Sequence, residues 1–191
     1  MDSALSIADE IIRRTDVVSE QSVMAVNRLL SMPAADPCSD ERIALMREIA
    51  IASSYVQLLG YVEDARLVCS SAGRHVPGIE LGPVDYVSAK GARIRTNATL
   101  PLAPGAAFII AERSGYAAVI HRSTPVDVFL NNRDVAVSVV SNSSGRLILN
   151  RGAYNPSWLR ALPKGGSARE FDGAYVIGLR RSEEFDVTAI A

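Results

Sequence analysis

The sequence predicts an α+β fold in which a long N-terminal helix and a second helix pack on one face of a mostly antiparallel sheet. Apolar residues recur with the helical spacing up to Ala52, and from Tyr55 onward they alternate with a period of two. Short turn-forming segments separate the alternating stretches, which is typical of hairpins. The 191 residues, 48% of them apolar, suffice for a substantial core. We therefore expect a single domain over residues 1–191, with a helical arm at 1–31 and an α+β core at 38–191.

The composition narrows the possible partners. Twenty Lys and Arg residues face 21 Asp and Glu residues, so the formal charge of −1 points neither to nucleic acid nor to an anionic membrane surface. The sequence contains neither a run of about 18 apolar residues nor the pattern of a signal peptide. Helical periodicity begins almost at Met1, and the last residues alternate as in a strand. We interpret the chain as a segment of a longer protein.

Residues 2–31 predict one helix of about 45 Å. Its apolar stripe has the spacing of a helix face and includes Ala4, Ala8, Ile11, Val18, Ala25 and Leu29. The stripe can pack on the helix's own domain. Alternatively, the helix pairs with a second copy of the chain and continues upstream into a membrane span.

A second helix is predicted shortly after the first one ends. Pro33 and Pro37 cannot continue a helix, so the first helix stops near residue 31. Ser39 is a good N-cap, and Asp40 and Glu41 place negative charge in the first turn, where the helix dipole favours it. Cys38 therefore lies directly before a helix N-terminus.

The remainder of the chain predicts strands. A hairpin is expected from 55–62 and 65–69, and the alternation along its second strand turns Cys69 inward. Residues 70–105 predict a long connection with a possible strand at 92–99. The chain then predicts, in order, a hairpin of 107–112 with 116–121, a short helix at 124–130, a hairpin of 135–140 with 146–149, and strands at 174–180 and 185–190.

Cys38 and Cys69 are the only cysteines and the main candidates for chemistry. Two thiols with scattered histidines do not make a zinc site, and no C-x-x-C motif is present. Three alternatives are open: buried thiols, a structural disulfide, or a disulfide whose state is sensed. A bond closing a loop of this length would stabilise the fold by about 3 to 4 kcal/mol in the chain-entropy model. The helix N-terminus favours the Cys38 thiolate, so this sulfur is the more reactive in exchange.

Other polar residues give weaker signals. His75 and His121 belong to no recognisable nucleophile motif, and we expect no catalytic residue, metal site or cofactor in this segment. Arg151, Tyr154, Trp158 and Arg160 cluster in one loop. They predict either a small-molecule pocket or a packed loop.

One stretch carries a family resemblance. The CSS-motif sensor domain found before EAL-type cyclic-di-GMP phosphodiesterase domains resembles this chain in four places: Pro37-Cys38-Ser39, the helix after it, Tyr55 through Gly60-Tyr61-Val62, and Leu67-Val68-Cys69-Ser70-Ser71 followed by Gly73. Ser70 and Ser71 are then the serines of the motif. The resemblance implies a PAS/Cache-like domain in the bacterial periplasm, between two transmembrane helices of an inner-membrane protein. The segment itself would not be an enzyme, whereas the full-length protein would be a cyclic-di-GMP hydrolase.

The resemblance also implies a role for the cysteines. In an oxidising compartment a Cys38–Cys69 disulfide persists, and it is expected to restrain the cytoplasmic EAL domain. Its loss would favour activity and a homodimer through the N-terminal helix, and periplasmic thiol-disulfide oxidoreductases would be its partners. The alternative is a small-ligand receptor of the Cache or PAS-like kind, in which the disulfide is purely structural and the 151–160 loop lines a pocket.

Overall fold

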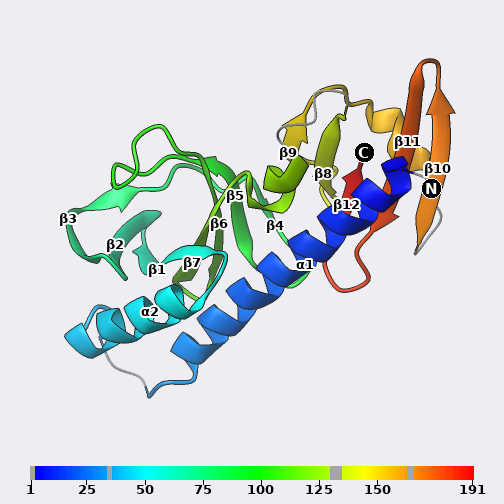
Figure 1. The fold of residues 1–191 in the computed structure, drawn as a ribbon. Helices are drawn as coiled ribbons and strands as arrows, with labels where there is room; N and C mark the ends of the chain where they lie inside the picture. Colours follow the sequence, from blue (N-terminus) through cyan, green and yellow to red (C-terminus); the bar gives the residue numbers. More distant parts are fainter. Residues whose placement is uncertain (1–2, 34–35, 130–134, 163–165) are drawn as a thin grey trace. The chain divides into compact units, whose positions relative to one another are not determined.

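The computed structural model describes residues 3–33, 36–129, 135–162 and 166–191, and it divides into two compact units (Figure 1). The central unit is Val18–Thr124, and the terminal unit combines Met1–Val17 with Pro125–Ala191. Helix α1, Ser3–Leu30, contributes residues to both. The units therefore do not coincide with the predicted arm and core, because α1 packs along its whole length. A single functional domain over 1–191 stays a prediction.

The central unit is built on a seven-stranded antiparallel sheet in the order β3-β2-β1-β7-β6-β5-β4. Its strands are β1 (Val56–Glu63), β2 (Arg66–Ser70), β3 (Gly73–Glu80), β4 (Tyr86–Val87), β5 (Arg93–Ala98), β6 (Phe108–Arg113) and β7 (Tyr116–His121). Alternation along β7 sends Ala118 into one apolar cluster and Val119 into another. The sheet is thus apolar on both faces.

Helices cover one face of this sheet. The C-terminal part of α1 and one side of α2, Asp40–Ala52, bury apolar residues in the same cluster as β1 and β7. Helix α2 begins where the sequence predicts, because the Ser39 side chain accepts a hydrogen bond from the backbone N–H of Arg42 at 3.3 Å. The opposite face is covered by the connections that contain Leu81 and Leu100. The α+β prediction, with two helices on antiparallel strands, is confirmed.

The first hairpin shows how local sequence sets the register. Asp64 and Ala65 both adopt positive φ, at 49° and 60°, as a tight two-residue turn requires. On β1, a Cβ at Gly60 would lie only 2.7 Å from the carbonyl oxygen of Cys69. Glycine is needed here because β1 and β2 approach closely beside the second cysteine.

The terminal unit holds a second sheet of five strands in the order β10-β11-β12-β8-β9. Its elements are the 3₁₀ helices η1 (Thr124–Phe129) and η2 (Pro156–Ala161) and the strands β8 (Val137–Ser141), β9 (Leu147–Arg151), β10 (Ser167–Asp172), β11 (Tyr175–Arg181) and β12 (Val187–Ile190). The first turn of α1 lies against β11, since a Cβ at Gly178 would meet the Ala4 backbone at 2.4 Å. The Ser182 hydroxyl also donates to Asp16 at 2.6 Å.

Two expectations were wrong. A single sheet was predicted, but the strands after η1 form a sheet of their own. The connection predicted over 70–105 contains β3 and β4 in addition to the strand expected at 92–99, and β10 was not predicted at all. Both β3 and β10 are edge strands that lack apolar alternation: β3 contains Pro77, and β10 is exposed along nearly all its length.

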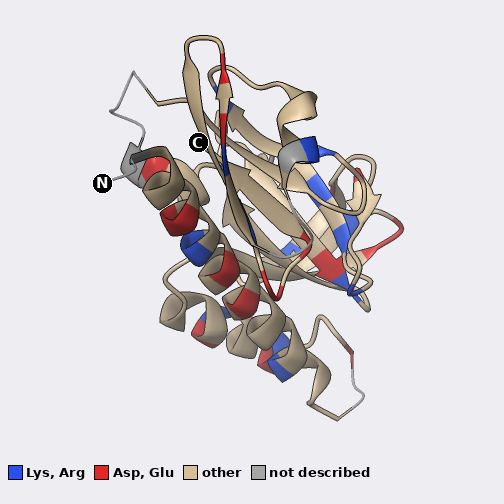
Figure 2. Ribbon diagram, turned by 90° about the vertical axis from the view of Figure 1, so that its right-hand side faces the viewer, with Lys and Arg blue, Asp and Glu red and all other residues tan. Residues whose placement is uncertain are grey.

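Acidic and basic residues occur together along α1, as Figure 2 shows. Within the described ranges, no helix is both long enough and apolar enough to cross a membrane.

Candidate functional site

A disulfide joins Cys38 to Cys69, with an Sγ–Sγ distance of 1.98 Å and a Cα–Cα distance of 5.7 Å. These Cα atoms lie at a separation typical of disulfides. Cys38 directly precedes Ser39, the N-cap of α2, and Cys69 lies on β2. The bond therefore ties the start of the second helix to the sheet. It is the pairing that the family resemblance implies.

The two sulfurs are almost completely shielded from water. Cys69 is 0% exposed and Cys38 9% exposed, and both belong to the apolar cluster that includes Leu29 of α1, Met46 of α2 and Leu59 of β1. The Cys69 sulfur also lies 3.7 Å from the carbonyl oxygen of Pro37. Thiol–disulfide exchange needs direct attack on a sulfur. Of the two cysteines, Cys38 is the less deeply buried.

The turn before α2 fixes Cys38 in place. Asp36 accepts the backbone N–H of Cys38 on its side chain at 2.8 Å and the N–H of Ser39 on its carbonyl oxygen at 3.0 Å. Arg74 of β3 lies 3.9 Å from both Asp36 and Asp40. These charged groups are largely exposed, so their ion pairs add little stability. The backbone hydrogen bonds hold the turn.

Ser70 closes the turn between β2 and β3. Its buried hydroxyl accepts the N–H of Ala72 at 3.1 Å and lies 2.9 Å from Nε2 of His75. Burial lowers the pKa of His75, so the neutral ring is favoured, and Nε2 can accept a hydrogen bond from the Ser70 hydroxyl. The sequence signal for this contact is the short β2–β3 turn, which brings residues 70 and 75 to the same edge.

Ser71, the second serine of the motif, acts through its backbone. Its N–H donates to the carbonyl oxygen of Leu59 at 2.8 Å, and its own carbonyl accepts from Nε of Arg47 at 3.1 Å. Leu59 lies on β1 and Arg47 on α2. Ser71 therefore adds a second link between α2 and the sheet, beside the disulfide.

Arg42 is a site residue that sequence reasoning missed. It lies in the first turn of α2, yet its side chain is only 4% exposed. The guanidinium donates to the carbonyl oxygens of Leu29 and Pro33 at 2.5 and 2.6 Å, and its carbon lies 6.0 Å from the Tyr116 ring centre. Burial raises the pKa of Tyr116, and the charge of Arg42 acts in the opposite direction. Arg42 thus connects α2, the end of α1 and strand β7.

The predicted loop cluster lies in the terminal unit. Tyr154 and Trp158 contact each other edge-on at 6.5 Å and pack against its apolar cluster, and Trp158 donates to Asp172 at 2.6 Å. Arg151 donates to the carbonyl oxygen of Val135 at 2.8 Å, while Arg160 is exposed on η2. The structure thus brings the two aromatic residues together. A ligand pocket at this loop stays a prediction.

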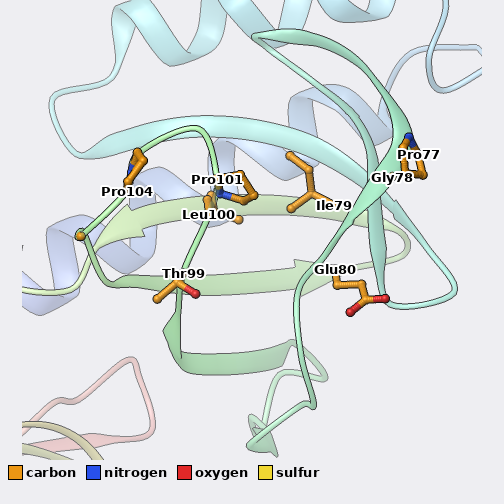
Figure 3. Close-up of a pocket in the computed structure, with 9 residues that line it drawn as sticks. Pro77, Gly78, Ile79, Glu80, Thr99, Leu100, Pro101 and Pro104 are labelled. Carbon is orange, nitrogen blue, oxygen red and sulfur yellow. The ribbon is translucent and has the colours of Figure 1, made fainter.

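A cavity of about 600 Å³ lies in the central unit instead (Figure 3). Ile79 of β3 lines one side, and Leu100 and Pro101 of the connection after β5 line the other. Its remaining lining residues are Pro77, Gly78, Glu80, Thr99, Pro104 and Gly105. The lining is mainly apolar, with the Thr99 hydroxyl and the Glu80 carboxylate as its polar side-chain groups. Glu80 is already paired with Arg66 at 2.7 Å.

Among the residues that the structure describes, the remaining titratable side chains form no recognisable reaction centre. His121 contacts Ser123 at 2.8 Å, and the Phe108 ring lies edge-on to it at 5.8 Å. Across the ranges that the structure describes, no group of three or more His, Cys, Asp or Glu residues could hold a metal ion. The disulfide and its surroundings are therefore the strongest candidate site.

A comparison with solved structures concerns the fold. The fold is similar to that of an extracellular ligand binding receptor from Desulfohalobium retbaense DSM5692, with a TM-score of 0.57 and 10% sequence identity. The match covers 97% of this chain and 38% of the receptor, so the chain spans well under half of the receptor's length. At this identity the likeness shows the fold alone, which is consistent with the predicted Cache/PAS-like class.

The family is also shown. The family model described as a CSS motif domain associated with EAL matches residues 2–191, and the chain belongs to this family. A comparison with curated protein sequences finds no match.

Proposed function

We propose that this chain is the periplasmic, redox-responsive sensor domain of a membrane-bound cyclic-di-GMP phosphodiesterase, and that the Cys38–Cys69 disulfide restrains the cytoplasmic EAL domain. The observation that supports it best is the disulfide itself, which ties a helix to the sheet in a domain of an EAL-associated family. The hydrolysis would be performed by the EAL domain, outside this chain. No cofactor is needed in this segment.

The proposed location rests on the same bond. Disulfides persist in oxidising compartments such as the periplasm and are rare in the cytosol. We therefore expect transmembrane helices to flank this domain in an inner-membrane protein, with the EAL domain on the cytoplasmic side. Periplasmic thiol-disulfide oxidoreductases would then be the partners that form or open the bond.

Opening the bond is a balanced two-step exchange. A thiolate of a reduced oxidoreductase attacks Sγ of Cys38, forms a mixed disulfide there and releases the Cys69 sulfur as a thiolate, which takes up a proton. The second thiol of the oxidoreductase then attacks the sulfur that the oxidoreductase contributes to the mixed disulfide. Cys38 leaves as a thiol, and the oxidoreductase carries the disulfide.

Loss of the bond would release α2, and with it the C-terminal part of α1, from the sheet of the central unit. The chain-entropy term for a separation of 31 residues is about 4 kcal/mol, and converting a mostly restrained population to a mostly active one takes about 5.5 kcal/mol. The two magnitudes are comparable. Helix α1 carries exposed apolar residues near its end, among them Met24 at 63% exposure. A homodimer through α1 would cover them.

The test uses the full-length phosphodiesterase in membranes. We expect cyclic-di-GMP hydrolysis and dimer content to rise when the wild type is reduced, and to be high in the Cys38→Ala/Cys69→Ala variant with or without reductant. The double variant also controls for any effect of the reductant on the EAL domain. Equal activity of the oxidised and reduced wild type would refute the redox role.

A second candidate function is a small-ligand receptor with a purely structural disulfide. The observation that favours it is the apolar cavity beside β3, in a fold similar to that of a protein described as an extracellular ligand binding receptor. A thermal-shift screen of small metabolites tests it. Ile79→Phe, which fills the cavity, should abolish any stabilisation, whereas Val76→Phe on the same strand, at a position 94% exposed, should not. This function also requires unchanged signalling in the double cysteine variant.

A further inference from the structure

We propose that Arg42 is the residue that couples the Cys38–Cys69 disulfide to the C-terminal end of α1. The inference rests on the proposed redox function and assigns its first step inside the domain. Arg42 is a positioning residue: it holds the last turn of α1 as long as the disulfide holds the first turn of α2.

The first argument is the chemistry of a helix end. The last four carbonyl groups of an α-helix have no partner within the helix. Leu29 lies in the last turn of α1, and its carbonyl oxygen accepts from Nη1 of Arg42 at 2.5 Å. Nη2 extends the contact to Pro33, just after the helix, at 2.6 Å. A positive charge at this end is also favoured by the helix dipole.

The second argument is the position of Arg42 relative to the disulfide. Its backbone N–H is held by the side chain of Ser39, the residue after Cys38. Its guanidinium lies over the Tyr116 ring, and Tyr116 contacts Tyr61 edge-on with ring centres 5.2 Å apart. Tyr61 of β1 is the direct partner of Cys69 in the β1–β2 register. Contacts therefore lead from Arg42 to both cysteines: through Ser39 to Cys38, and through Tyr116 and Tyr61 to Cys69.

The third argument is burial. Arg42 as a whole is only 4% exposed, so its guanidinium is buried, and the two hydrogen bonds of this group in the described structure go to neutral carbonyl oxygens. A buried charge without a carboxylate partner gains solvation when it is allowed to move outward. When the disulfide opens, the first turn of α2 is no longer tied to β2. Arg42 can then reach water, and the carbonyl of Leu29 loses its charged donor and keeps only the longer contact from the N–H of Met32 at 3.4 Å.

The consequence concerns a helix that both compact units contain. Residues 3–17 of α1 belong to the terminal unit and residues 18–30 to the central unit. Fraying at Leu29 therefore concerns the part of α1 that belongs to the central unit. No other element of the described structure is needed for this step.

Hydrogen exchange on the 191-residue chain tests the coupling. The probes are the amides of Ser31 and Met32, which donate to the carbonyl oxygens of Asn27 and Leu29 at 3.0 and 3.4 Å. We expect these amides to lose protection at least about tenfold when the wild type is reduced. In oxidised Arg42→Gln the same loss should occur although thiol titration finds the disulfide intact. Oxidised Arg42→Lys, which keeps the charge and one donor, should lie between.

Glu48→Gln is the matched control. Glu48 also joins α2 to α1, through an ion pair with Arg28 at 2.7 Å, but both side chains are more than half exposed. Exposed pairs contribute little, so protection at residues 31 and 32 should stay within twofold of wild type. Retained protection in both oxidised Arg42 variants, or in the reduced wild type, would overturn the inference.

The redox function is judged separately, by cyclic-di-GMP hydrolysis in the full-length protein. Equal activity of the oxidised and reduced wild type rejects the function. If the wild type responds but oxidised Arg42→Gln stays fully restrained, the function stands and the coupling through Arg42 is rejected. Partial release of activity in oxidised Arg42→Gln, with the disulfide intact, supports both.

Discussion

Removal of the disulfide should destabilise the central unit by an amount that its loop length sets. Cys38 and Cys69 are separated by 31 residues, for which the chain-entropy model gives about 4 kcal/mol at 25 °C. Typical domains have about 5 to 15 kcal/mol in total, so the loss is a large fraction. At roughly 2 to 4 °C per kcal/mol for chains of this size, the melting temperature should fall by about 8 to 16 °C.

The assay is urea unfolding followed by far-UV circular dichroism. Oxidised wild type is compared with reduced wild type and with Cys38→Ala/Cys69→Ala. The reduced wild type and the double variant should have the same unfolding midpoint, and reductant should leave the midpoint of the double variant unchanged. A difference below about 1 kcal/mol between the oxidised and reduced wild type would show that the closed loop does not constrain the unfolded chain. The energetic basis of the switch would then be lost.

Three further predictions concern the central unit. Glu112→Gln should cost about 3 kcal/mol in urea unfolding, because Arg95, 2.8 Å away and 2% exposed, would stay buried without its carboxylate; exposed Glu63→Gln is the control, and a loss no larger than the control's contradicts the reasoning. Gly60→Ala should cost about 1 to 3 kcal/mol and slow formation of the disulfide, since its Cβ would overlap β2; an oxidation rate equal to wild type would show that the strands can separate. Because the folded-state pKa of His75 is lowered, its neutral form is stabilising: that contribution is complete above the unfolded pKa near 6.5 and declines as the pH falls below it. His75→Gln should therefore reduce the loss of melting temperature between pH 7.5 and 5.5, and an unchanged loss would assign the pH dependence to other groups.

Elements with strong local signals could be predicted from the sequence. Both helices follow from apolar spacing, and α2 starts at Ser39 because a capping side chain needs only its own neighbours. The first hairpin follows from alternation around Asp64, and the inward direction of Cys69 follows from its place on the strand. The pairing of the two cysteines needed the family resemblance, because the residues themselves left buried thiols, a structural disulfide and a sensed disulfide open as alternatives.

Features that depend on remote neighbours could not be predicted. Arg42 lies among charged residues at the start of a helix, a pattern typical of a solvent-exposed turn. Its burial arises because α1 ends beside α2 and presents unpaired carbonyl groups there. The same holds for β10, whose exposed residues give no alternation and whose order comes from pairing with β11. The second sheet is assembled by the pairing of β8 with β12, whose partner residues, such as Ser141 and Val187, lie far apart in the sequence.

Trp158 provides a fluorescence probe that reports on one of the two compact units. It is the only tryptophan in the sequence, and it lies in the terminal unit between the rings of Tyr154 and Tyr175. Both sulfurs lie in the central unit. In the reduced protein, indole emission and thiol accessibility therefore monitor different units of the same sample, and recording them together during denaturation reveals whether the two units unfold as one cooperative body or in succession.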